Sequence, residues 1–378
     1  MTAGLRLTRL ALTEFRNYAT LDWRPERPVS VLFGPNGNGK TNLLEAVSLL
    51  VPGRGLRGAR TADLARRGGG GRWAVAARLE TPDGPLDLGT GTLAEGAHDR
   101  RVFRMDGAPP RNQAEVAARV AAVWLTPQMD RLFQEGAAGR RRFLDRLVYA
   151  LEPAHAREIA ANDSAVAQRN RLLAEGREDP AWLAALEDAI ARHAVAATAA
   201  RAGLIARINA ALAAGAAAPF PAARLGLADP VADRLAADRA VATEAWLRDA
   251  LAAARRADRE AGGTGLGAHR ADMLLTDEAG LPAAEASTGQ QKALLVGVVL
   301  GHAAIIADAR GFAPMLLLDE PAVHLDADRR LALCAALLRL PAQAVLTGTD
   351  PDVFASFGEA AEYWRVEAGT LRRAAAGA

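Results

Sequence analysis

The chain has 378 residues, of which 50% are hydrophobic and 24% are charged, and its net charge is only +2. This length predicts one large or two ordinary folded domains, and this composition excludes a disordered chain. The near-neutral charge excludes a globally basic protein, so any binding of nucleic acid requires local arginine patches. Cys334 is the single cysteine. It excludes an intrachain disulfide and a cysteine-based zinc site, and we expect a small buried hydrophobe there.

Two further observations concern the cellular compartment. The first 18 residues carry charges throughout and contain no uninterrupted apolar segment, so we expect no signal peptide. The longest apolar run, Ala293 to Ala307, is shorter than the ~20 residues of a membrane span and contains His302. We therefore expect a cytoplasmic protein that does not associate with a membrane.

The first third of the chain is expected to be rich in strands. Residues 5–33 alternate in polarity and end in the apolar segment VSVLF, and a helix is expected over residues 41–50. Residues 52–72 are rich in Gly and Arg and should form a loop or a short helix. Residues 73–105 contain short apolar segments separated by turn residues, which predicts a β-meander.

The middle of the chain is expected to be helical. Residues 140–217 are composed mainly of Ala, Leu, Arg and Glu, which predicts long amphipathic helices of ~20–30 residues. Prolines interrupt this pattern between Pro219 and Pro230, and helix resumes over residues 232–260. Strand signals return at residues 273–277, 313–318 and 342–349, with a long apolar helix over residues 293–308. We therefore expect an α/β head, residues 1–139 and 261–378, with a helical lobe, residues 140–260, inserted in it.

A glycine-rich loop follows the first buried strand and precedes a helix. Its sequence matches G-x-x-x-x-G-K-[ST], in which glycines let backbone N–H groups surround phosphates at a helix N-terminus. Lys40, one of only two lysines in the chain, would place a compact charge between the β- and γ-phosphates, and Thr41 would bind Mg²⁺. The alternative is a chance glycine-rich turn. The residues expected to bind nucleotide are Gly34, Pro35, Asn36, Gly37, Asn38, Gly39, Lys40, Thr41 and Asn42.

Two acids end a later apolar strand. A straight apolar run such as Met315 to Leu318 is typical of a buried parallel strand, and ligands bind at the carboxyl ends of such strands. Asp319 would hold Mg²⁺, and Glu320 would polarise the attacking water as the catalytic base. The alternative is an ordinary acidic exit from a strand.

The segment Ser287-Thr288-Gly289-Gln290-Gln291-Lys292 opens the long apolar helix. A serine hydroxyl, open N–H groups and the positive end of the helix dipole would together form a second surface that faces phosphate. An ordinary helix N-cap is the alternative, because Ser287 or Thr288 would supply one as well.

These segments together resemble known families. The phosphate loop, the Ser287 segment, the acidic strand and Leu346-Thr347-Gly348-Thr349 resemble the head of ABC-type ATPases. More specific segments are similar to those of the RecF family, the recombination mediators of bacteria, over essentially the whole chain. They are EFRNY (Glu14 to Tyr18), GPNGNGKTN, a Gly-x-x-x-Arg stretch ending at Arg57, RRRFLD (Arg140 to Asp145), Gly267-x-His269-Arg270-x-Asp272, STGQQK and LLLDEPAVHLD.

The resemblance implies a fold and further site residues. The fold would be an ABC-type P-loop ATPase head, with a mixed or parallel sheet, an antiparallel β subdomain and an inserted α-helical lobe. Ser287, Gly289 and Gln290 would belong to a signature that contacts the γ-phosphate of ATP bound to a second subunit, which Lys292 would also face. Three positions are carried over one by one: Asp326 in a loop that communicates across the dimer, Thr347 where many relatives have a switch histidine, and Gln128 as the glutamine-loop candidate.

Several arginines are candidates for binding DNA. Arg57 and Arg60 lie on the Gly-rich segment after the phosphate-loop helix and could reach phosphates, or they could be solvated loop residues. Arg140, Arg141 and Arg142 open the helical lobe and could contact DNA or be solvated, as could Arg255 and Arg256. His269-Arg270 could bind DNA or form a structural bridge.

The resulting functional hypothesis is an ATP-driven clamp. ATP with Mg²⁺ would join two heads into a homodimer that binds single-stranded and gapped duplex DNA, and slow hydrolysis would open it. By resemblance, the protein would help to load recombinase at gaps and stalled forks, support the SOS response, and act with the RecO and RecR proteins. Two alternatives remain open: a nucleotide-binding subunit of a transporter, and an ATP-gated clamp without hydrolysis.

Overall fold

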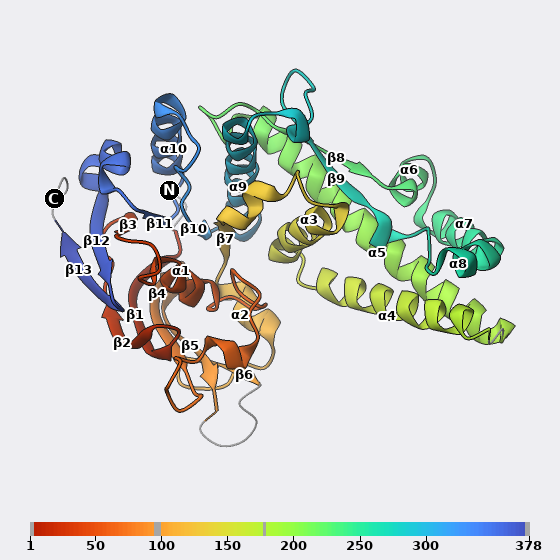
Figure 1. Ribbon diagram of the computed structural model, residues 1–378, viewed down its shortest axis with the longest axis horizontal. Helices are drawn as coiled ribbons and strands as arrows, with labels where there is room; N and C mark the ends of the chain where they lie inside the picture. Colours follow the sequence, from red (N-terminus) through yellow and green to blue (C-terminus); the bar gives the residue numbers. More distant parts are fainter. Residues whose placement is uncertain (1–3, 94–99, 177–178, 375–378) are drawn as a thin grey trace. The chain divides into compact units, whose positions relative to one another are not determined.

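The computed structural model describes residues 4–93, 100–176 and 179–374, and the chain divides into two compact units (Figure 1). Unit 1 consists of Met1–Asp130, Ala211–Ala222 and Ser287–Ala378, and unit 2 consists of Arg131–Ala210 and Ala223–Ala286. These bounds differ from the expected head and lobe. Residues 131–139 and 261–286 belong to unit 2 instead of the expected head, and in the second of these segments residues 272–276 form a strand that pairs with residues 224–228 of the same unit. Residues 211–222 belong to unit 1 instead of the expected lobe.

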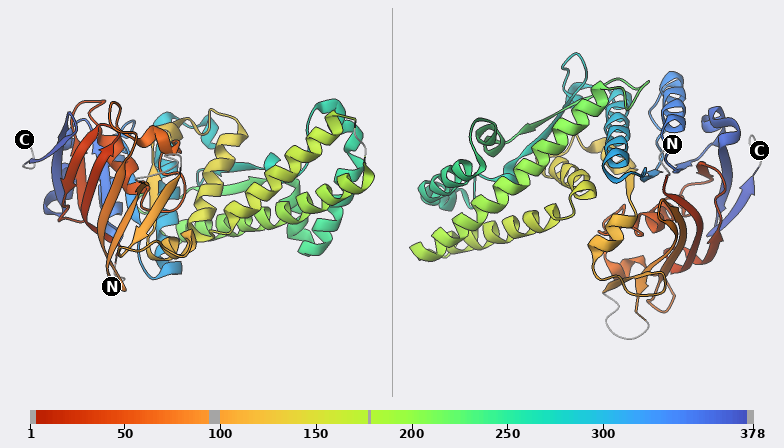
Figure 2. Two further views of the ribbon diagram at one scale, coloured as in Figure 1. Left: turned by 90° about the horizontal axis from the view of Figure 1, so that it is seen from below. Right: turned by 180° about the vertical axis from the view of Figure 1, so that it is seen from behind.

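Unit 1 contains an antiparallel sheet in the strand order β2-β1-β4-β5-β6, whose strands lie side by side in Figure 2. The strands alternate between buried and exposed positions, which is the pattern of a sheet with one face on the core. This sheet contains the expected meander. Its strands are β1 (Arg6–Phe15), β2 (Tyr18–Trp23), β4 (Ala74–Thr81), β5 (Gly84–Thr92) and β6 (Arg101–Met105).

A mixed sheet in the order β13-β12-β3-β11-β10-β7 positions the site. All its neighbouring pairs are parallel except β12 with β13. In register, Phe33 lies opposite Gly348 and Leu346 opposite Leu318, so the carboxyl ends of β3, β11 and β10 meet at one edge. The strands are β3 (Val29–Phe33), β7 (Ala122–Leu125), β10 (Met315–Leu318), β11 (Ala344–Gly348), β12 (Ala361–Glu367) and β13 (Thr370–Ala374).

Unit 1 also contains helices and 3₁₀ segments. They are α1 (Lys40–Ser48), α2 (Gln113–Arg119), α9 (Thr288–Arg310) and α10 (Ala327–Arg339), with the 3₁₀ segments η1 (Thr61–Leu64), η2 (Pro127–Arg131, which ends at the first residue of unit 2) and η5 (Pro351–Ala360). The helix α2 and the strands β7, β12 and β13 were not predicted from the sequence. Cys334 is buried in α10 as expected.

Within the part of the chain that the structure describes, two helices are long and apolar enough, by length and composition, to cross a membrane. They are α9 and α5 (Pro180–Ala213). The expectation that no segment has this length is therefore corrected, because α9 has 23 residues and extends beyond its apolar run. The most apolar stretch of α9 is 78% buried inside the protein, which accounts for its composition as a core helix.

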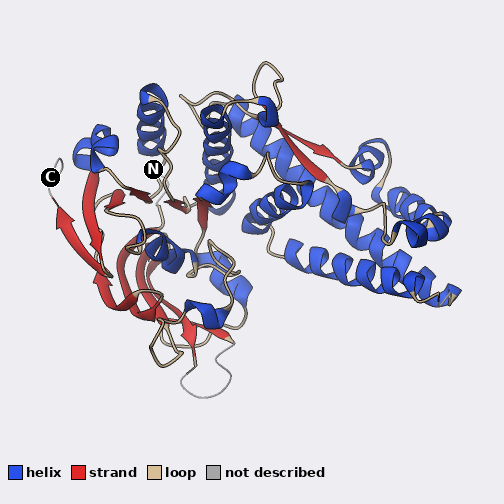
Figure 3. Ribbon diagram, viewed as in Figure 1, coloured by secondary structure: helices blue, strands red, loops and turns tan. Residues whose placement is uncertain are grey.

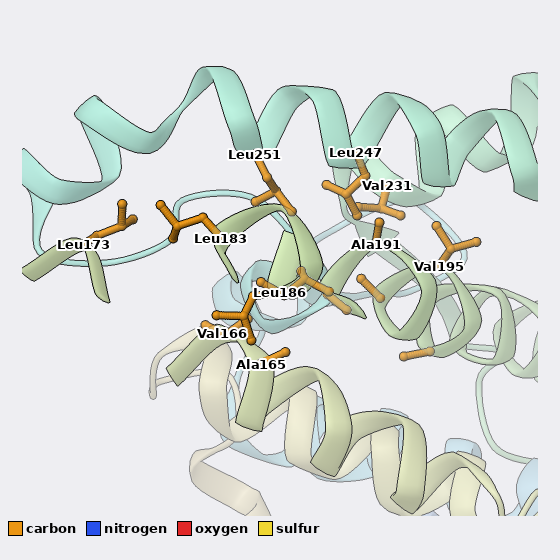
Figure 4. Packing of buried hydrophobic residues seen from close by; sticks show 14 of the residues in the cluster. Ala165, Val166, Leu173, Leu183, Leu186, Ala191, Val195, Val231, Leu247 and Leu251 are labelled. Atoms are coloured by element: carbon orange, nitrogen blue, oxygen red, sulfur yellow. The ribbon is translucent and has the colours of Figure 1, made fainter. Parts of the chain in front are cut away.

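Unit 2 is mainly helical, with one two-stranded antiparallel ribbon (Figure 3). The ribbon pairs β8 (Arg224–Ala228), which lies where prolines predicted only a break, with β9 (Asp272–Thr276). Figure 4 shows the core, where apolar side chains of four helices, α4 to α7, pack together. The remaining elements are α3 (Ala137–Leu151), α4 (His155–Ala174), α6 (Pro230–Ala237), α7 (Ala240–Ala253), α8 (Arg255–Ala261), η3 (Ala268–Arg270) and η4 (Ala283–Glu285).

Candidate nucleotide-binding site

The phosphate loop joins β3 to α1 at the carboxyl edge of the mixed sheet. Gly34, Gly37 and Gly39 have φ angles of 137°, 84° and 108°, a region that glycine adopts without steric penalty. A Cβ atom on Gly34 would lie 2.6 Å from the carbonyl oxygen of Val366, so that position also requires a close approach of two backbones. No side chain caps α1, so its first N–H groups are open to an external acceptor such as a phosphate.

Lys40 lies inside this loop and is only 5% exposed. Its Nζ donates to the carbonyl oxygens of Gly34 at 2.5 Å and Pro35 at 3.1 Å, and to Oδ1 of Asn36 at 3.3 Å. Burial lowers the pKa of Lys40, and the negative charges of Glu320 and Asp319 oppose that shift. Among the described residues, the hydrogen-bond acceptors of this ammonium group are two loop carbonyls and Asn36 Oδ1, and a phosphate oxygen is a stronger acceptor for it.

The acidic pair lies beside the loop, where the parallel strands end. Asp319 is 4% exposed, and its Oδ1 accepts hydrogen bonds from Thr41 Oγ1 at 2.9 Å and Thr347 Oγ1 at 2.7 Å. Thr347 Oγ1 in turn accepts from the main-chain N–H of Glu320 at 2.8 Å. The structure thus brings Thr41, Asp319, Glu320 and Thr347 together, from α1, the end of β10 and β11.

These oxygen donors fit a hard divalent cation such as Mg²⁺. The buried Asp319 carboxylate and the Thr41 hydroxyl already lie within hydrogen-bond distance, and both atoms are of the type that Mg²⁺ prefers. Across the residues that the structure describes, no group of three or more His, Cys, Asp or Glu side chains could hold a metal. Mg²⁺ is commonly held by one or two protein oxygen ligands together with substrate phosphates, and the Asp319 carboxylate and the Thr41 hydroxyl are ligands of that type.

Arg57 is anchored to α1 rather than free on its loop. Its Nη1 donates to Asn42 Oδ1 at 2.6 Å and lies 3.4 Å from Glu45 Oε2, and its side chain stays 35% exposed. Asn42 lies two positions after Lys40, so Arg57 is held near the phosphate loop. Arg60 is exposed and precedes η1.

Ser287 forms the N-cap of α9. Its Oγ accepts from Gln290 N at 3.3 Å and its N–H donates to Gln290 Oε1 at 2.9 Å, which is a complete capping box. Gly289 is buried, and a Cβ there would lie 2.7 Å from the carbonyl oxygen of His324. The signature segment therefore packs against the loop that follows β10, and Ser287 and Gln290 remain exposed.

Asp326 caps α10 in the same loop. Its carboxylate accepts from Arg329 N at 2.9 Å and Arg329 Nη1 at 2.7 Å, and its side chain stays more than half exposed. The structure therefore shows a helix-capping role for this residue.

The expected orientation of Lys292 is wrong. The side chain is 1% exposed and points inward, where Nζ contacts both carboxylate oxygens of Asp130, at 2.8 and 2.9 Å. Asp130 lies in η2, two residues after Gln128, which is exposed. Lys292 thus ties the start of α9 to the segment that carries Gln128.

The arginines that open α3 differ in their contacts. Arg140 binds Asp272 with two hydrogen bonds, at 2.7 and 2.8 Å, and Arg141 donates to the carbonyl oxygen of Ala271 at 2.8 Å. Arg142 is exposed. The contacts of Arg140 and Arg141 support a structural role in unit 2, in which they tie α3 to the segment before β9.

His269 and Arg255 also have structural contacts within unit 2, whereas Arg270 is exposed. His269 Nε2 lies 2.9 Å from the carbonyl oxygen of Thr264. Arg255 binds Glu187, which belongs to a buried ionic network centred on the fully buried Arg169, whereas Arg256 is 89% exposed. These contacts support the structural alternative for His269, and they give Arg255 a structural role that neither of its two interpretations, a DNA contact or a solvated charge, included.

The turn between β1 and β2, with the first residue of β2, contributes site residues that the sequence did not predict. Asn17 and Tyr18 contact the phosphate loop, and Arg16 binds Glu45 of α1 with two hydrogen bonds of 2.8 Å. The EFRNY pattern indicated a family resemblance and no role. The sequence feature that could have indicated a role is the presence of amide, hydroxyl and charged side chains within these five consecutive residues.

Comparisons with known proteins agree on one family. The family model described as the RecF/RecN/SMC N terminal domain matches residues 6–370. The chain is 46% identical to the DNA replication and repair protein RecF of Mesorhizobium japonicum, covering 98% of both chains. It is 44% identical to the protein of the same description from Allorhizobium ampelinum, covering 97% of this chain and 98% of the relative.

Solved structures show the same fold. The recombination mediator protein RecF-ATPrS in the RecFOR pathway gives a TM-score of 0.84 at 19% identity and covers 99% of each chain. The corresponding RecF-ATP structure gives 0.79 at 20% identity, covering 98% of this chain and 99% of that one. An Smc head domain from Pyrococcus furiosus gives 0.52 at 14% identity, covering 98% and 96%. The expected α/β fold with a mixed sheet, an antiparallel sheet and a helical insert is thereby confirmed. With the extent of the sequence matches, this chain belongs to the RecF family of DNA replication and repair proteins.

Proposed function

We propose that the protein binds ATP with Mg²⁺ at the phosphate loop and uses this binding to control its association with DNA. The observation that carries the proposal is the convergence of Lys40, Thr41 and Asp319 at one edge of the sheet. Backbone N–H groups at the start of α1 and the Lys40 ammonium would hold the phosphates, and Thr41 and Asp319 would hold the cation. Two solved structures of the same fold are named as ATP and ATPrS complexes, which supports this nucleotide.

Glu320 is the proposed catalytic base for hydrolysis. Its main chain has a φ of 50° and its N–H donates to Thr347, so the backbone of Glu320 is held directly after Asp319, the proposed Mg²⁺ ligand. A carboxylate in that position can orient and deprotonate the water that attacks the γ-phosphate. We expect slow turnover, because the ATP-bound state is the proposed working state.

A second copy of the chain would complete the nucleotide site. Ser287 and Gln290 are exposed at the N-terminus of α9, where the helix dipole and the N–H groups of the first turn that the capping box does not use favour an anion. We propose that this segment contacts the γ-phosphate held by the other copy, so that ATP joins two heads. Asp326, Gln128 and Thr347 would line or support that interface from the same edge of the fold.

DNA is the proposed partner of the ATP-bound dimer. The curated relatives are named DNA replication and repair proteins, and the solved structures are named for the RecFOR pathway, which supports gapped DNA and the RecO and RecR proteins as partners. The exposed side chains of Arg57, Arg60 and Arg142 are the candidates for phosphate contacts, and such contacts weaken as salt rises. Support for the SOS response belongs to the same proposal. Full-length similarity to repair proteins disfavours the transporter alternative.

The deciding experiment measures oligomeric state and ATP hydrolysis with and without gapped DNA. Wild type should dimerise only with ATP, and Lys40→Met should stay monomeric because it lacks the cation that holds the phosphates. Glu320→Gln should bind ATP, dimerise and remain on DNA while hydrolysis falls about 100-fold or more. Glu359→Gln, at an exposed position in η5, is the control for the same change of charge.

Three outcomes would overturn parts of this proposal. A wild-type protein that remains monomeric with ATP and DNA would exclude the clamp. Unchanged hydrolysis in Glu320→Gln would exclude Glu320 as the base. An absence of hydrolysis in wild type, combined with ATP-dependent retention on DNA, would establish the clamp without hydrolysis instead.

A further inference from the structure

The turn between β1 and β2 and the first residue of β2 are directed at the phosphate loop through two consecutive side chains. Asn17 Nδ2 donates to the carbonyl oxygen of Asn38 at 3.0 Å, and Tyr18 Oη donates to the carbonyl oxygen of Gly39 at 3.0 Å. Two successive peptide groups of the loop are therefore held by two successive residues of a different element. All these residues belong to unit 1.

The bond from Asn17 orients the Asn38 carbonyl, and the bond from Tyr18 orients the Gly39 carbonyl together with the first hydrogen bond of α1, from Leu43 N at 3.1 Å. These bonds determine where the neighbouring N–H groups point. In a planar trans peptide the C=O of one residue and the N–H of the next point in opposite directions. Fixing the Asn38 and Gly39 carbonyls toward the turn therefore directs the N–H groups of Gly39 and Lys40 away from it. Those N–H groups precede the first intrahelical hydrogen bonds of α1, so an external acceptor has to satisfy them.

The packing around Gly39 shows that Asn17 is fitted to this place. A Cβ atom on Gly39 would overlap the side-chain amide of Asn17, so the amide fills the space that the glycine leaves open. Asn17 Oδ1 also accepts from Asn42 Nδ2 at 2.8 Å, so one amide binds the loop before Gly39 and the helix after it. The amide is thus oriented by both of its polar atoms.

Asn42 extends this connection to Arg57. Its Oδ1 accepts from Arg57 Nη1 at 2.6 Å, which gives a continuous path from the Asn38 carbonyl through Asn17 and Asn42 to a half-exposed arginine. The turn itself is held by backbone hydrogen bonds from Arg16 N to Leu64 O at 2.9 Å and from Arg66 N to Glu14 O at 2.7 Å. The turn is therefore held in place by the main chain, and its hydrogen bonds in turn position the phosphate loop and, through Asn42, Arg57.

We infer that Asn17 and Tyr18 are positioning residues that direct the Gly39 and Lys40 N–H groups toward the nucleotide phosphates. This inference rests on the proposed nucleotide binding and adds to it a cause for the shape of the loop. The Tyr18 hydroxyl is buried, and burial raises its pKa, so it stays protonated and can donate throughout the physiological range. Neither side chain has to touch the nucleotide.

The test compares the affinity of the full-length protein for ADP and ATP, measured by calorimetry with Mg²⁺, between wild type, Tyr18→Phe and Asn17→Ala. Each variant removes one hydrogen bond to the loop, and each should weaken both affinities about fivefold to tenfold. Tyr363→Phe is the matched control. Tyr363 is also buried in unit 1 and donates to a main-chain carbonyl, that of Phe354 at 2.9 Å, away from the loop.

The control separates positioning from general stability. Both tyrosine variants should lower Tm to a similar extent, whereas only Tyr18→Phe should weaken nucleotide binding. Unchanged affinity in folded Tyr18→Phe and Asn17→Ala would overturn the inference, and so would an equal loss of affinity in Tyr363→Phe. If Asn17→Ala does not fold, Tyr18→Phe decides alone because it removes a single oxygen atom.

The Lys40→Met variant separates two possible negative results: that Asn17 and Tyr18 have no positioning role, and that the protein does not bind nucleotide at the phosphate loop. A wild-type protein that binds no nucleotide would overturn both conclusions. Wild-type binding that Lys40→Met abolishes, together with unchanged affinity in the Tyr18 and Asn17 variants, would leave nucleotide binding intact and overturn only the positioning role.

Discussion

The hydroxyl group of Thr347 is shared between the two acids that follow β10. It donates to Asp319 and accepts from the N–H of Glu320. The resemblance placed this residue where many relatives carry a switch histidine, and the contacts give it a different task. Thr347 holds both acids in one arrangement from β11, the neighbouring strand.

Replacement of that hydroxyl should therefore affect the site more than the fold. Thr347→Val has nearly the same shape, and it should cost about 1–3 kcal/mol in the free energy of unfolding because it leaves buried polar groups unpaired. ATP hydrolysis should fall further than ATP affinity. Thr198→Val is the control, because buried Thr198 donates to Asp229 at 2.8 Å in unit 2. It should lower stability equally without changing hydrolysis, and equal hydrolysis in both variants would contradict the role of Thr347.

His269 should make the stability of unit 2 depend on pH. Burial lowers its pKa below the ordinary value of 6.5, and the positive charges of Arg270 and Arg141 add to that shift, against the opposing hydrogen bond to Thr264. The unfolded chain therefore binds the proton more readily, so stability is complete above pH 6.5 and falls as the pH drops toward the lowered pKa. Urea unfolding between pH 7.5 and 5.5 should show this loss, and His269→Gln should reduce it. An unchanged slope in the variant would exclude His269 as the cause.

The residues that would bind the phosphates and the cation could be predicted from local motifs. The residues that hold them in place could not, because their contacts form only in the folded protein. Gly34 to Thr41 and the Asp319-Glu320 pair each carry their signal within a few consecutive residues. Asn17 and Lys292 act on residues that are close only after folding. The sequence therefore predicted that Lys292 would face outward, whereas it is buried against Asp130.

At the scale of elements, the pair of Lys292 and Asp130 joins α9 to η2. Its two members differ in exposure, since the Lys292 side chain is 1% exposed and that of Asp130 is 22% exposed. Removal of Asp130 therefore leaves a deeply buried ammonium group, whereas removal of Lys292 leaves a partly exposed carboxylate. A deeply buried ammonium without its partner is expensive, whereas a half-buried carboxylate can recover part of its hydration.

A double-mutant cycle should reveal this asymmetry. Asp130→Ala should lower the free energy of unfolding by about 3–5 kcal/mol, and Lys292→Met should cost clearly less. The double variant should be more stable than Asp130→Ala alone, because it no longer buries an unpaired charge. Urea unfolding of the four proteins measures the cycle. Strictly additive losses would show that the two elements are not coupled through this pair.

The elements that the sequence missed share a physical cause. β7 and β8 are short, and their pairing supplies stability that local propensity does not reveal. β8 also lies inside a proline-flanked segment that predicted only a break, and β12 lacks the continuous apolar pattern of β3 and β10. Long helices were predictable because their patterns extend over many residues, and β3 was predictable because its short apolar run leads directly into the glycine-rich loop.

At the scale of the whole molecule, the chain has two compact units. The apolar cluster in Figure 4 belongs to unit 2, and the mixed sheet provides a separate core in unit 1. A chain of this kind need not unfold in a single step. A bound nucleotide would stabilise only the unit that holds it.

Unfolding followed by hydrogen–deuterium exchange should therefore resolve two transitions. ATP at 100 times its Kd should stabilise the transition of unit 1 by about 2.7 kcal/mol and leave that of unit 2 nearly unchanged. Lys40→Met should abolish the shift. An equal stabilisation of both units in wild type would show that they unfold as one cooperative body.

The strand order of the mixed sheet also has a consequence for synthesis on the ribosome. β3 pairs with β11 and β12, which are made ~300 residues later, whereas the antiparallel sheet pairs strands close in sequence. The segment that precedes the phosphate loop therefore emerges early and waits for its neighbours until translation is almost complete. Until then it is an apolar strand with two unpaired edges, and such edges promote aggregation. A message truncated shortly before β11 should thus yield a nascent chain that depends on chaperones, although every residue of the phosphate loop has already been made.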